Sequence, residues 1–262
     1  MLIDSHCHLD RVDLKPYGDD FAALMAATRN AGVSHLLCVS IDLESYPDML
    51  ALVEGFPEVS ISVGVHPNDH DRREPTVAEL VELARHPKNV AIGETGLDYF
   101  RTEGDLEWQR ERFRTHIRAA REAGKPLIIH ARDAREDTIT ILREERADEV
   151  GGVMHCFTET WEMAQAALEM NFFISFSGIV TFRNAEDLRA VAARVPEERL
   201  LIETDSPYLA PMPYRGKPNE PKYVVRIAET IAGLRGVSAE RLAQRSSDNF
   251  FRLFRAARPE TG

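Results

Sequence analysis

The 262-residue chain contains little cysteine, no long apolar run and no excess of basic residues. Its three cysteines, Cys7, Cys38 and Cys156, are scattered and lack C-x-x-C spacing, which argues against a disulfide framework and indicates a reducing compartment. The chain has no run of 18 apolar residues, and its N-terminus lacks the charged and apolar regions of an export signal. We therefore expect a cytoplasmic protein that does not enter the membrane.

The charge balance is acidic, with 43 Asp and Glu against 32 Lys and Arg and a net charge of −11. A broad basic face of the kind that general nucleic-acid binders use is therefore not expected. A local cationic site is still compatible with this composition, because bound divalent ions concentrate positive charge in one pocket.

Short apolar runs rich in β-branched residues recur along the chain, at 2–6, 36–40, 59–65, 90–94, 126–130, 151–157, 172–177 and 200–204. The segments between them have the apolar period of amphipathic helices, as over 105–124, where the pattern stops at Gly124. Eight alternations predict a (β/α)8 TIM barrel, with residues 1–262 as a single domain and a C-terminal helix pair within 238–256 packed on it. A doubly wound open sheet is the rival, but the chain lacks a glycine-rich dinucleotide turn after the first run.

Side chains that bind metals stand at the expected C-terminal ends of six of these strands: His6, His8, His66, Glu94, His130, His155 and Asp205. In a TIM barrel these ends meet on the face that carries the active site. Side chains alternate along a strand, so His6 and His8 should project inward together, whereas Cys7 and Cys156 should face the helices. The sequence thus predicts that these ligands converge on one site.

Imidazole and carboxylate ligands without cysteine suit a divalent ion used for hydrolysis, such as Zn, Mn or Mg. Six ligands are too many for one open catalytic site, so we expect two divalent metal ions bridged by Glu94. The expected metal ligands are His6, His8, Glu94, His130, His155 and Asp205.

Eight segments resemble, in order, those of the TatD family of metal-dependent deoxyribonucleases, a branch of the amidohydrolase-like barrels. They are DSHCHLD (4–10), GVHP (64–67), IGETGLDY (92–99), IIHARDA (128–134), HCFTE (155–159), SGIVTF (177–182), IETDSPYLAP (202–211) and NFFRLF (249–254). The resemblance implies a two-metal phosphodiesterase acting on DNA, and the six expected ligands match the family's ligand positions. The chain departs from the family at Pro218, where a basic residue is usual, and at Ala131, where a hydroxyl residue is common.

Two carboxylates are the expected catalytic residues. Asp205 is placed to ligate one ion and to accept a proton from the attacking water, although a purely ligating role is the alternative. Glu94 would bridge the ions, and Glu203, two residues before Asp205, would orient a metal ligand without binding an ion itself.

His66 and Arg132 are the candidates for binding substrate phosphate, because both follow a strand and the ion count does not require them. A salt bridge to a helix is the competing role for Arg132. Arg215 and Lys217 lie in the loop after the last strand, where barrels often bind phosphate, and a solvated loop is the alternative. Tyr99 and Phe100 either stack on a base or pack in the interior.

The acidic composition favours contact with a few nucleotides of single-stranded DNA over a long duplex, and the resemblance implies 3′–5′ exonuclease action at strand ends. The main alternative is a metal-dependent ester or amide hydrolase, such as a D-aminoacyl-tRNA deacylase or a cyclic-amide hydrolase. A lysine that could form a carboxylated bridge is absent from the ends of the fourth and fifth runs. A non-enzymatic metal- or partner-binding barrel is a third reading, and no obligate protein partner is evident.

Overall fold

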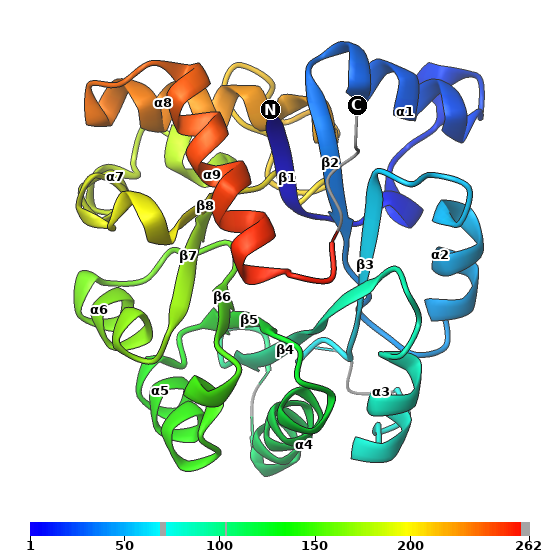
Figure 1. Cartoon of the computed structure of the whole chain (residues 1–262). Coiled ribbons are helices and arrows are strands. Elements are labelled where there is room, and N and C mark those ends of the chain that lie inside the picture. Colours follow the sequence, from blue (N-terminus) through cyan, green and yellow to red (C-terminus); the bar gives the residue numbers. More distant parts are fainter. Residues whose placement is uncertain (69–71, 103, 258–262) are drawn as a thin grey trace.

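A computed structural model describes residues 1–68, 72–102 and 104–257 of the chain. Eight parallel strands, paired in chain order from β1 to β8, form a nearly closed barrel that helices surround (Figure 1). This arrangement confirms the predicted (β/α)8 fold. The strands are β1 (Leu2–Cys7), β2 (Val33–Cys38), β3 (Val59–Val63), β4 (Asn89–Asp98), β5 (Leu127–Arg132), β6 (Gly152–Met154), β7 (Phe172–Phe176) and β8 (Leu200–Ile202).

The helices follow the strands as the apolar periodicity predicted. They are α1 (Phe21–Asn30), α2 (Tyr46–Val53), α3 (Val77–Leu83), α4 (Glu107–Ala123), α5 (Arg135–Glu144), α6 (Trp161–Glu169), α7 (Glu186–Arg194), α8 (Val224–Arg235) and α9 (Ala239–Leu253). Helix α4 ends at Gly124, whose left-handed φ of 63° is the conformation that glycine adopts at helix C-termini without a steric penalty.

The first and last strands meet through residues that lie at or just beyond their ends. Cys7 and Ser206 form a parallel bridge, and the His8 N–H donates to the Ser206 carbonyl at 2.8 Å. The Asp205 N–H donates to the His6 carbonyl at 2.9 Å. The barrel seam therefore holds three of the expected ligands beside one another.

An apolar layer fills the barrel interior and includes side chains from α9. Its strand residues are Ile3, Leu37, Val90, Ala91, Ile128, Val153, Phe173 and Leu201, and α9 contributes Phe250. Phe254, directly after α9, joins the same layer and is fully buried. The 238–256 segment contains this one continuous helix, not the expected pair, and α9 packs against β1, β8 and α8.

Helix α4 presents a buried polar stripe to the barrel, formed by Gln109, Arg112 and His116 at helical spacing. The Gln109 amide donates to the Pro67 carbonyl at 3.0 Å, and Arg112 donates to the His66 carbonyl at 2.9 Å. His116 Nε2 accepts from the Val65 N–H at 3.0 Å. These bonds fix the backbone of the segment that follows β3.

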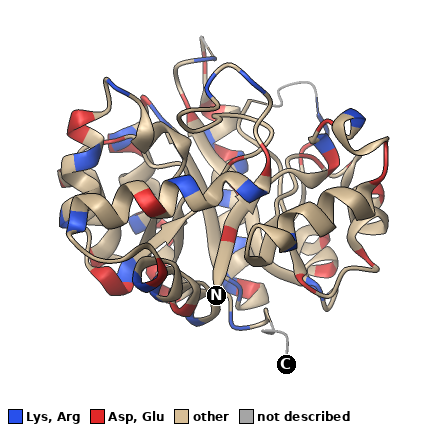
Figure 2. Ribbon diagram, turned by 90° about the horizontal axis from the view of Figure 1, so that it is seen from above, with Lys and Arg blue, Asp and Glu red and all other residues tan. Residues whose placement is uncertain are grey.

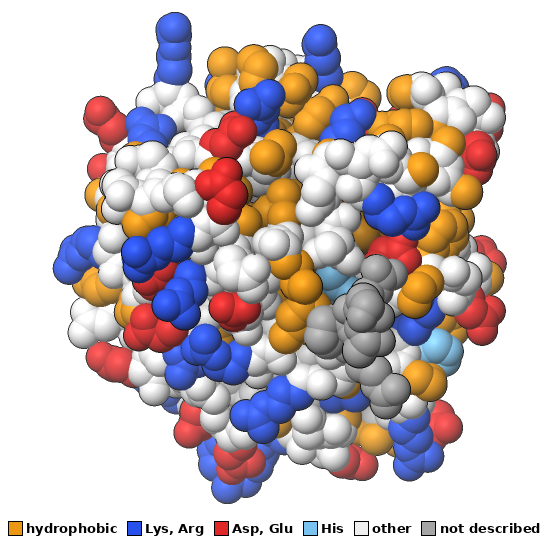
Figure 3. Space-filling model, turned by 45° about the horizontal axis from the view of Figure 1, so that its top comes forward, with side chains coloured by type: hydrophobic (Ala, Val, Ile, Leu, Met, Phe, Trp, Pro, Cys, Tyr) orange, Lys and Arg blue, Asp and Glu red, His pale blue; other side chains and the backbone are white. Residues whose placement is uncertain are grey.

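Charged side chains of both signs are interspersed over the outer helices, and Figure 3 shows the same mixture on the face that it presents (Figures 2 and 3). On the face drawn in Figure 3, acidic side chains lie among the basic ones. Among the helices of the described residues, none has the length and apolar character needed to cross a membrane.

His35 and His116 are buried as neutral side chains, and burial lowers the pKa of each to about 4. Below the usual histidine pKa of about 6.5 the unfolded chain binds more protons at these sites than the folded protein. The contribution of these two sites to stability should therefore be nearly complete above about pH 6.5 and fall as the pH drops toward 4. Each histidine should contribute a loss of about 1.5 kcal/mol between pH 6.5 and 5.

Urea unfolding at several pH values tests this expectation. His116→Gln should lower stability at pH 7 yet show a shallower loss toward pH 5 than the parent protein. His86→Gln, at a partly exposed histidine, is the control and should retain the parent's pH dependence. An unchanged slope in His116→Gln would show that His116 is not a source of acid sensitivity.

Candidate metal centre

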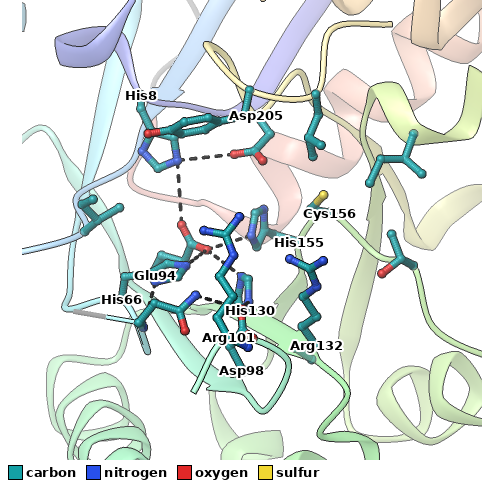
Figure 4. Close-up of a pocket in the computed structure, with 17 residues that line it drawn as sticks. His8, His66, Glu94, Asp98, Arg101, His130, Arg132, His155, Cys156 and Asp205 are labelled. Carbon is teal, nitrogen blue, oxygen red and sulfur yellow. Dashed lines mark hydrogen bonds and ion pairs between the residues drawn. The ribbon is translucent and has the colours of Figure 1, made fainter. Parts of the chain in front are cut away.

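The expected ligands lie together at the C-terminal ends of the strands, and all of them except His6 line a cavity of about 660 Å³ (Figure 4). His6 lies within β1 and His8 directly after it, so strand alternation turns both toward the interior. His130 lies in β5, His155 directly follows β6, and Asp205 follows β8 by three residues. Parallel strands thus bring together residues that are far apart in the sequence.

Strand β4 continues four residues past the predicted end at Glu94, to Asp98. Two glycines allow it to approach β5 closely at this point. A Cβ on Gly93 would lie 2.7 Å from the Ile128 carbonyl oxygen, and one on Gly96 would collide with the carbonyl of His130. Glycine at these positions therefore lets Glu94 and His130 come within hydrogen-bonding distance.

The Glu94 carboxylate is 2% exposed and lies at the centre of the cluster. Its Oε1 lies 2.9 Å from His155 Nε2 and 3.2 Å from His130 Nδ1. Its Oε2 lies 3.3 Å from His6 Nε2 and 3.9 Å from His8 Nε2. The carboxylate thus faces the imidazoles of four expected ligands, two from strands β1 and β5 and two from the residues directly after β1 and β6.

Three of these histidines are held by hydrogen bonds from the ring nitrogen that points away from the centre. His155 Nδ1 pairs with Glu203 Oε1 at 3.0 Å, and His8 Nδ1 pairs with the Val39 carbonyl at 3.0 Å. His130 Nε2 pairs with Asp98 Oδ2 at 3.0 Å. Oxygen acceptors at these positions hold a proton on the outer nitrogen, so each neutral ring turns its lone pair inward.

Asp205 lies across the cavity from His130 (Figure 4). Its Oδ1 lies 3.4 Å from His8 Nε2 and 3.7 Å from His6 Nε2. The Asp205 backbone has a φ of 56°, a left-handed conformation that is uncommon outside glycine and concentrates at functional sites. The fold therefore holds this carboxylate against the pair of histidines from β1.

The cluster strongly shifts the pKa values of its members. Burial raises the pKa of Glu94, but His155 and His66 outweigh that effect and hold it well below its usual range. Burial lowers the pKa of His155, yet Glu94 and Glu203 outweigh it and raise the pKa well above the ordinary value. The carboxylates therefore stay ionised and attract positive charge to the centre.

The donor set fits a divalent metal ion. His6 Nε2 and His8 Nε2 lie 3.3 Å apart, and the Val39 hydrogen bond leaves His8 Nε2 as an acceptor. A cation between such nitrogens and the neighbouring carboxylates satisfies all of them at once. Among the described residues, three groups have ligand atoms within 4.8 Å of one another: His6, His155 and Glu203; His6, His8 and Asp205; His66, Glu94 and His130.

The structure brings all six expected ligands into this cluster and places Glu203 against His155. Arg132 lines the cavity, as its expected role in binding substrate requires. His66 lies with the candidate ligands, because its Nε2 is 3.3 Å from Glu94 Oε1. The Asn68 N–H donates to His66 Nδ1 at 3.0 Å, which in a neutral ring leaves the proton on Nε2.

Cys156 differs from its expected position facing the helices. It lines the cavity, and its Sγ lies 3.1 Å from Ser177 Oγ. Strand β6 ends at Met154 and Cys156 has a left-handed φ of 42°, so strand alternation no longer determines where the side chain points. Cys7, in contrast, is fully buried in the core between barrel and helices, as predicted.

Of four other residues near the strand ends, two line the cavity and two do not. The Tyr99 hydroxyl donates to Asp137 Oδ2 at 2.5 Å and thus points toward α5, while the Arg215 guanidinium lies 4.4 Å from the centre of the Phe182 ring. Neither Tyr99 nor Arg215 lines the cavity, whereas Asp98 and Arg101 do. Sequence reasoning missed Asp98 and Arg101 because it ended the fourth strand at Glu94, although the Asp98 in the segment IGETGLDY was a usable signal.

The sequence matches the family described as TatD related DNase over residues 3–255. An Escherichia coli K12 protein named uncharacterized metal-dependent hydrolase YcfH is 50% identical over 254 residues, which cover 97% of this chain and 95% of the relative. An Edwardsiella piscicida protein named 3′-5′ ssDNA/RNA exonuclease TatD is 35% identical over 248 residues, 92% of this chain and 95% of the relative.

Solved structures of similar proteins have the same fold. The crystal structure of YJJV, a TatD homologue from Escherichia coli K12, superposes with a TM-score of 0.88 at 29% identity and covers 97% of this chain and 98% of that one. A TatD-family hydrolase from Entamoeba histolytica has a TM-score of 0.84 at 24% identity, with 97% of each chain covered.

Removal of the central carboxylate should abolish metal binding. Glu94→Gln keeps the shape of the side chain but loses its charge, so isothermal titration with Mn or Zn should show an affinity loss beyond the ~10- to 100-fold typical of losing an outer hydrogen-bond partner. Glu203→Gln, which weakens the hold on His155 but leaves the central carboxylate in place, should fall within that 10- to 100-fold range.

Glu58→Gln is the matched control. Glu58 is a buried glutamate directly before β3 that pairs with Arg29 of α1, away from the cluster. It should bind metal as the parent protein does. Parent-like metal affinity in Glu94→Gln would contradict the central position assigned to Glu94.

Proposed function

The chain belongs to the TatD-related DNase family, and we propose that it is a divalent-metal-dependent hydrolase that cleaves phosphodiester bonds at the ends of single-stranded DNA. The observation that carries this proposal is the convergence of four imidazoles on the buried Glu94 carboxylate at the floor of an open cavity. Relatives named as metal-dependent hydrolases and as a 3′-5′ exonuclease of single-stranded nucleic acid support it.

We propose that two divalent ions would be held by His6, His8, Glu94, His130, His155 and Asp205, and that Glu94 would contact both. Divalent ions at such a centre stabilise negative charge on phosphoryl oxygens and lower the pKa of water. The nitrogen and oxygen ligands are compatible with Mg, Mn or Zn.

Asp205 is the residue proposed to take the proton of the attacking water. It lines the cavity and is 9% exposed, so its carboxylate faces the space that substrate would enter. Burial raises the pKa of Asp205, but His8 and His155 outweigh that effect and hold it below its usual value. The carboxylate is therefore ionised at neutral pH and able to accept a proton.

The remaining residues would hold the ligands and the substrate. Glu203 accepts from His155 and from the Cys156 N–H at 2.7 Å, which fixes the orientation of the ring. Arg132 would bind substrate phosphate from the cavity wall. His66 was also expected to bind substrate phosphate. Its Nε2–H would donate either to Glu94 or to a substrate phosphate bound next to Glu94.

The alternative of ester or amide hydrolysis uses the same metal centre. Among the described residues that line the cavity there is no lysine, so a carboxylated-lysine bridge of the kind found in related cyclic-amide hydrolases has no counterpart here. The carboxylate of Glu94 occupies the central position instead. This difference favours phosphodiesters over cyclic amides.

Metal-stripped protein should release mononucleotides from end-labelled single-stranded DNA only after Mg, Mn or Zn is restored. Substrates labelled at the 5′ or 3′ end, with an RNA of the same sequence, give the polarity and the preferred sugar. Binding of metal with no cleavage of any strand would refute the nuclease assignment and direct assays to D-aminoacyl-tRNA and cyclic amides.

Asp205→Asn should lower kcat by about 10²- to 10⁴-fold even at saturating metal, because an amide cannot accept the proton. Recovery of the rate at high metal concentration would show that Asp205 acts only as a ligand. Asp137→Asn, at a carboxylate that pairs with Arg110 outside the cavity, is the control and should retain full activity.

A further inference from the structure

Two arginines on one wall of the cavity lack an acidic partner. Arg101 follows β4 and Arg132 ends β5, and both line the cavity. Within the described part of the chain, no carboxylate forms an ion pair with either guanidinium, whereas all five arginines of α4 form such pairs: Arg110, Arg112, Arg114, Arg118 and Arg121. In an acidic protein, two uncompensated guanidinium groups in one cavity indicate an anionic ligand.

Contacts that leave the charge uncompensated hold the Arg132 side chain and the backbone of Arg101 in place. The Arg132 guanidinium carbon lies 3.9 Å from the centre of the Phe100 ring, a cation–π contact that orients the group without neutralising it. Asp98 Oδ1 accepts from the backbone N–H groups of Phe100 at 3.1 Å and of Arg101 at 3.0 Å. These bonds fix the start of the segment that carries Arg101.

The same Asp98 carboxylate connects this segment to the metal centre. Its Oδ2 accepts from Asn68 Nδ2 at 2.8 Å and pairs with His130 Nε2 at 3.0 Å, and Asp98 is 1% exposed. In the sheet, Asp98 of β4 pairs directly with Arg132 of β5. Both arginines therefore originate beside His130, and Figure 4 shows them extending from this side of the cavity in the direction of His155.

The arginines add a second anion-binding element beside the metal cluster. Neither arginine forms an ion pair with Glu94 or Asp205, so both guanidinium groups are available to bind an anionic ligand. Planar guanidinium groups bind phosphate through paired, charge-assisted hydrogen bonds. We propose that Arg101 and Arg132 form a subsite for a second phosphate, adjacent in the substrate to the phosphodiester that is cleaved.

This inference rests on the proposed nuclease function and narrows its substrate class. A strand end that presents two successive phosphates would engage both the metal centre and the arginine subsite. A diester without a neighbouring phosphate would engage the metal centre alone. The preferred substrates are then oligonucleotides with a phosphate on each side of a nucleoside, not simple phosphodiesters.

Three dinucleotides test the subsite: dTpdT, pdTpdT and dTpdTp, which differ only by a terminal phosphate. With metal-loaded protein, one of the two phosphorylated forms should have a kcat/KM about tenfold or more above that of dTpdT. Arg101→Ala and Arg132→Ala should each bring this ratio toward one. Arg101→Lys and Arg132→Lys keep the positive charge and should retain part of the kcat/KM preference. This result separates loss of the subsite from misfolding.

Arg194→Ala is the matched control. The Arg194 guanidinium carbon lies 4.1 Å from the centre of the Trp161 ring on the outer helices, so this variant also removes an arginine stacked on an aromatic ring, but outside the cavity. It should retain the parent's ratio. Equal effects of Arg194→Ala and Arg132→Ala would mean that overall charge, not a subsite, sets the preference.

Binding of the same dinucleotides in excess chelator, where no cleavage occurs, separates the two proposals. In one outcome the parent protein binds a phosphorylated form more tightly, the arginine variants lose this preference, and the metal-loaded protein cleaves nothing. That result would support the subsite and refute the nuclease function. Equal cleavage of all three dinucleotides would refute the subsite and leave the nuclease function standing. Equal binding and no cleavage would refute both.

Discussion

The buried carboxylate of Glu94 is the feature on which the rest of the site depends. An ionised group so fully removed from water is costly unless positive charge or hydrogen-bond donors compensate it. Five imidazoles, including that of His66, lie around it, and three of them are held from behind by Asp98, Glu203 and the Val39 carbonyl. These outer contacts turn the rings inward, so the site is already arranged around the place where a cation would sit.

The barrel supplies this arrangement because parallel strands end on one face. The seam between β1 and β8 places His6 and His8 beside Asp205, and the close approach of β4 to β5 places Glu94 beside His130. Beneath them the apolar layer closed by Phe250 and Phe254 excludes water from the opposite end of the barrel. The polar stripe of α4 then fixes the segment that carries His66.

The strand pattern predicted the barrel and the meeting of the six expected ligands. Side-chain alternation is a local property of a strand, and the regular alternation of strands with helices implies a parallel sheet whose strands end on one face. It did not predict what happens beyond the strand ends. Cys156 has a left-handed backbone conformation and lines the cavity. Strand β4 extends to Asp98, whose carboxylate contacts both His130 and the backbone N–H of Arg101. Such contacts join segments distant in sequence and leave no periodic signal.

Crystals grown with Mn or Zn and measured at the absorption edge of the metal would test whether Glu94 contacts two ions. We expect two anomalous peaks, each within coordination distance of a Glu94 carboxylate oxygen, one beside His6 and His8 and the other beside His130. Peaks only at surface carboxylates, or an ordered centre in which Glu94 contacts no metal, would contradict it.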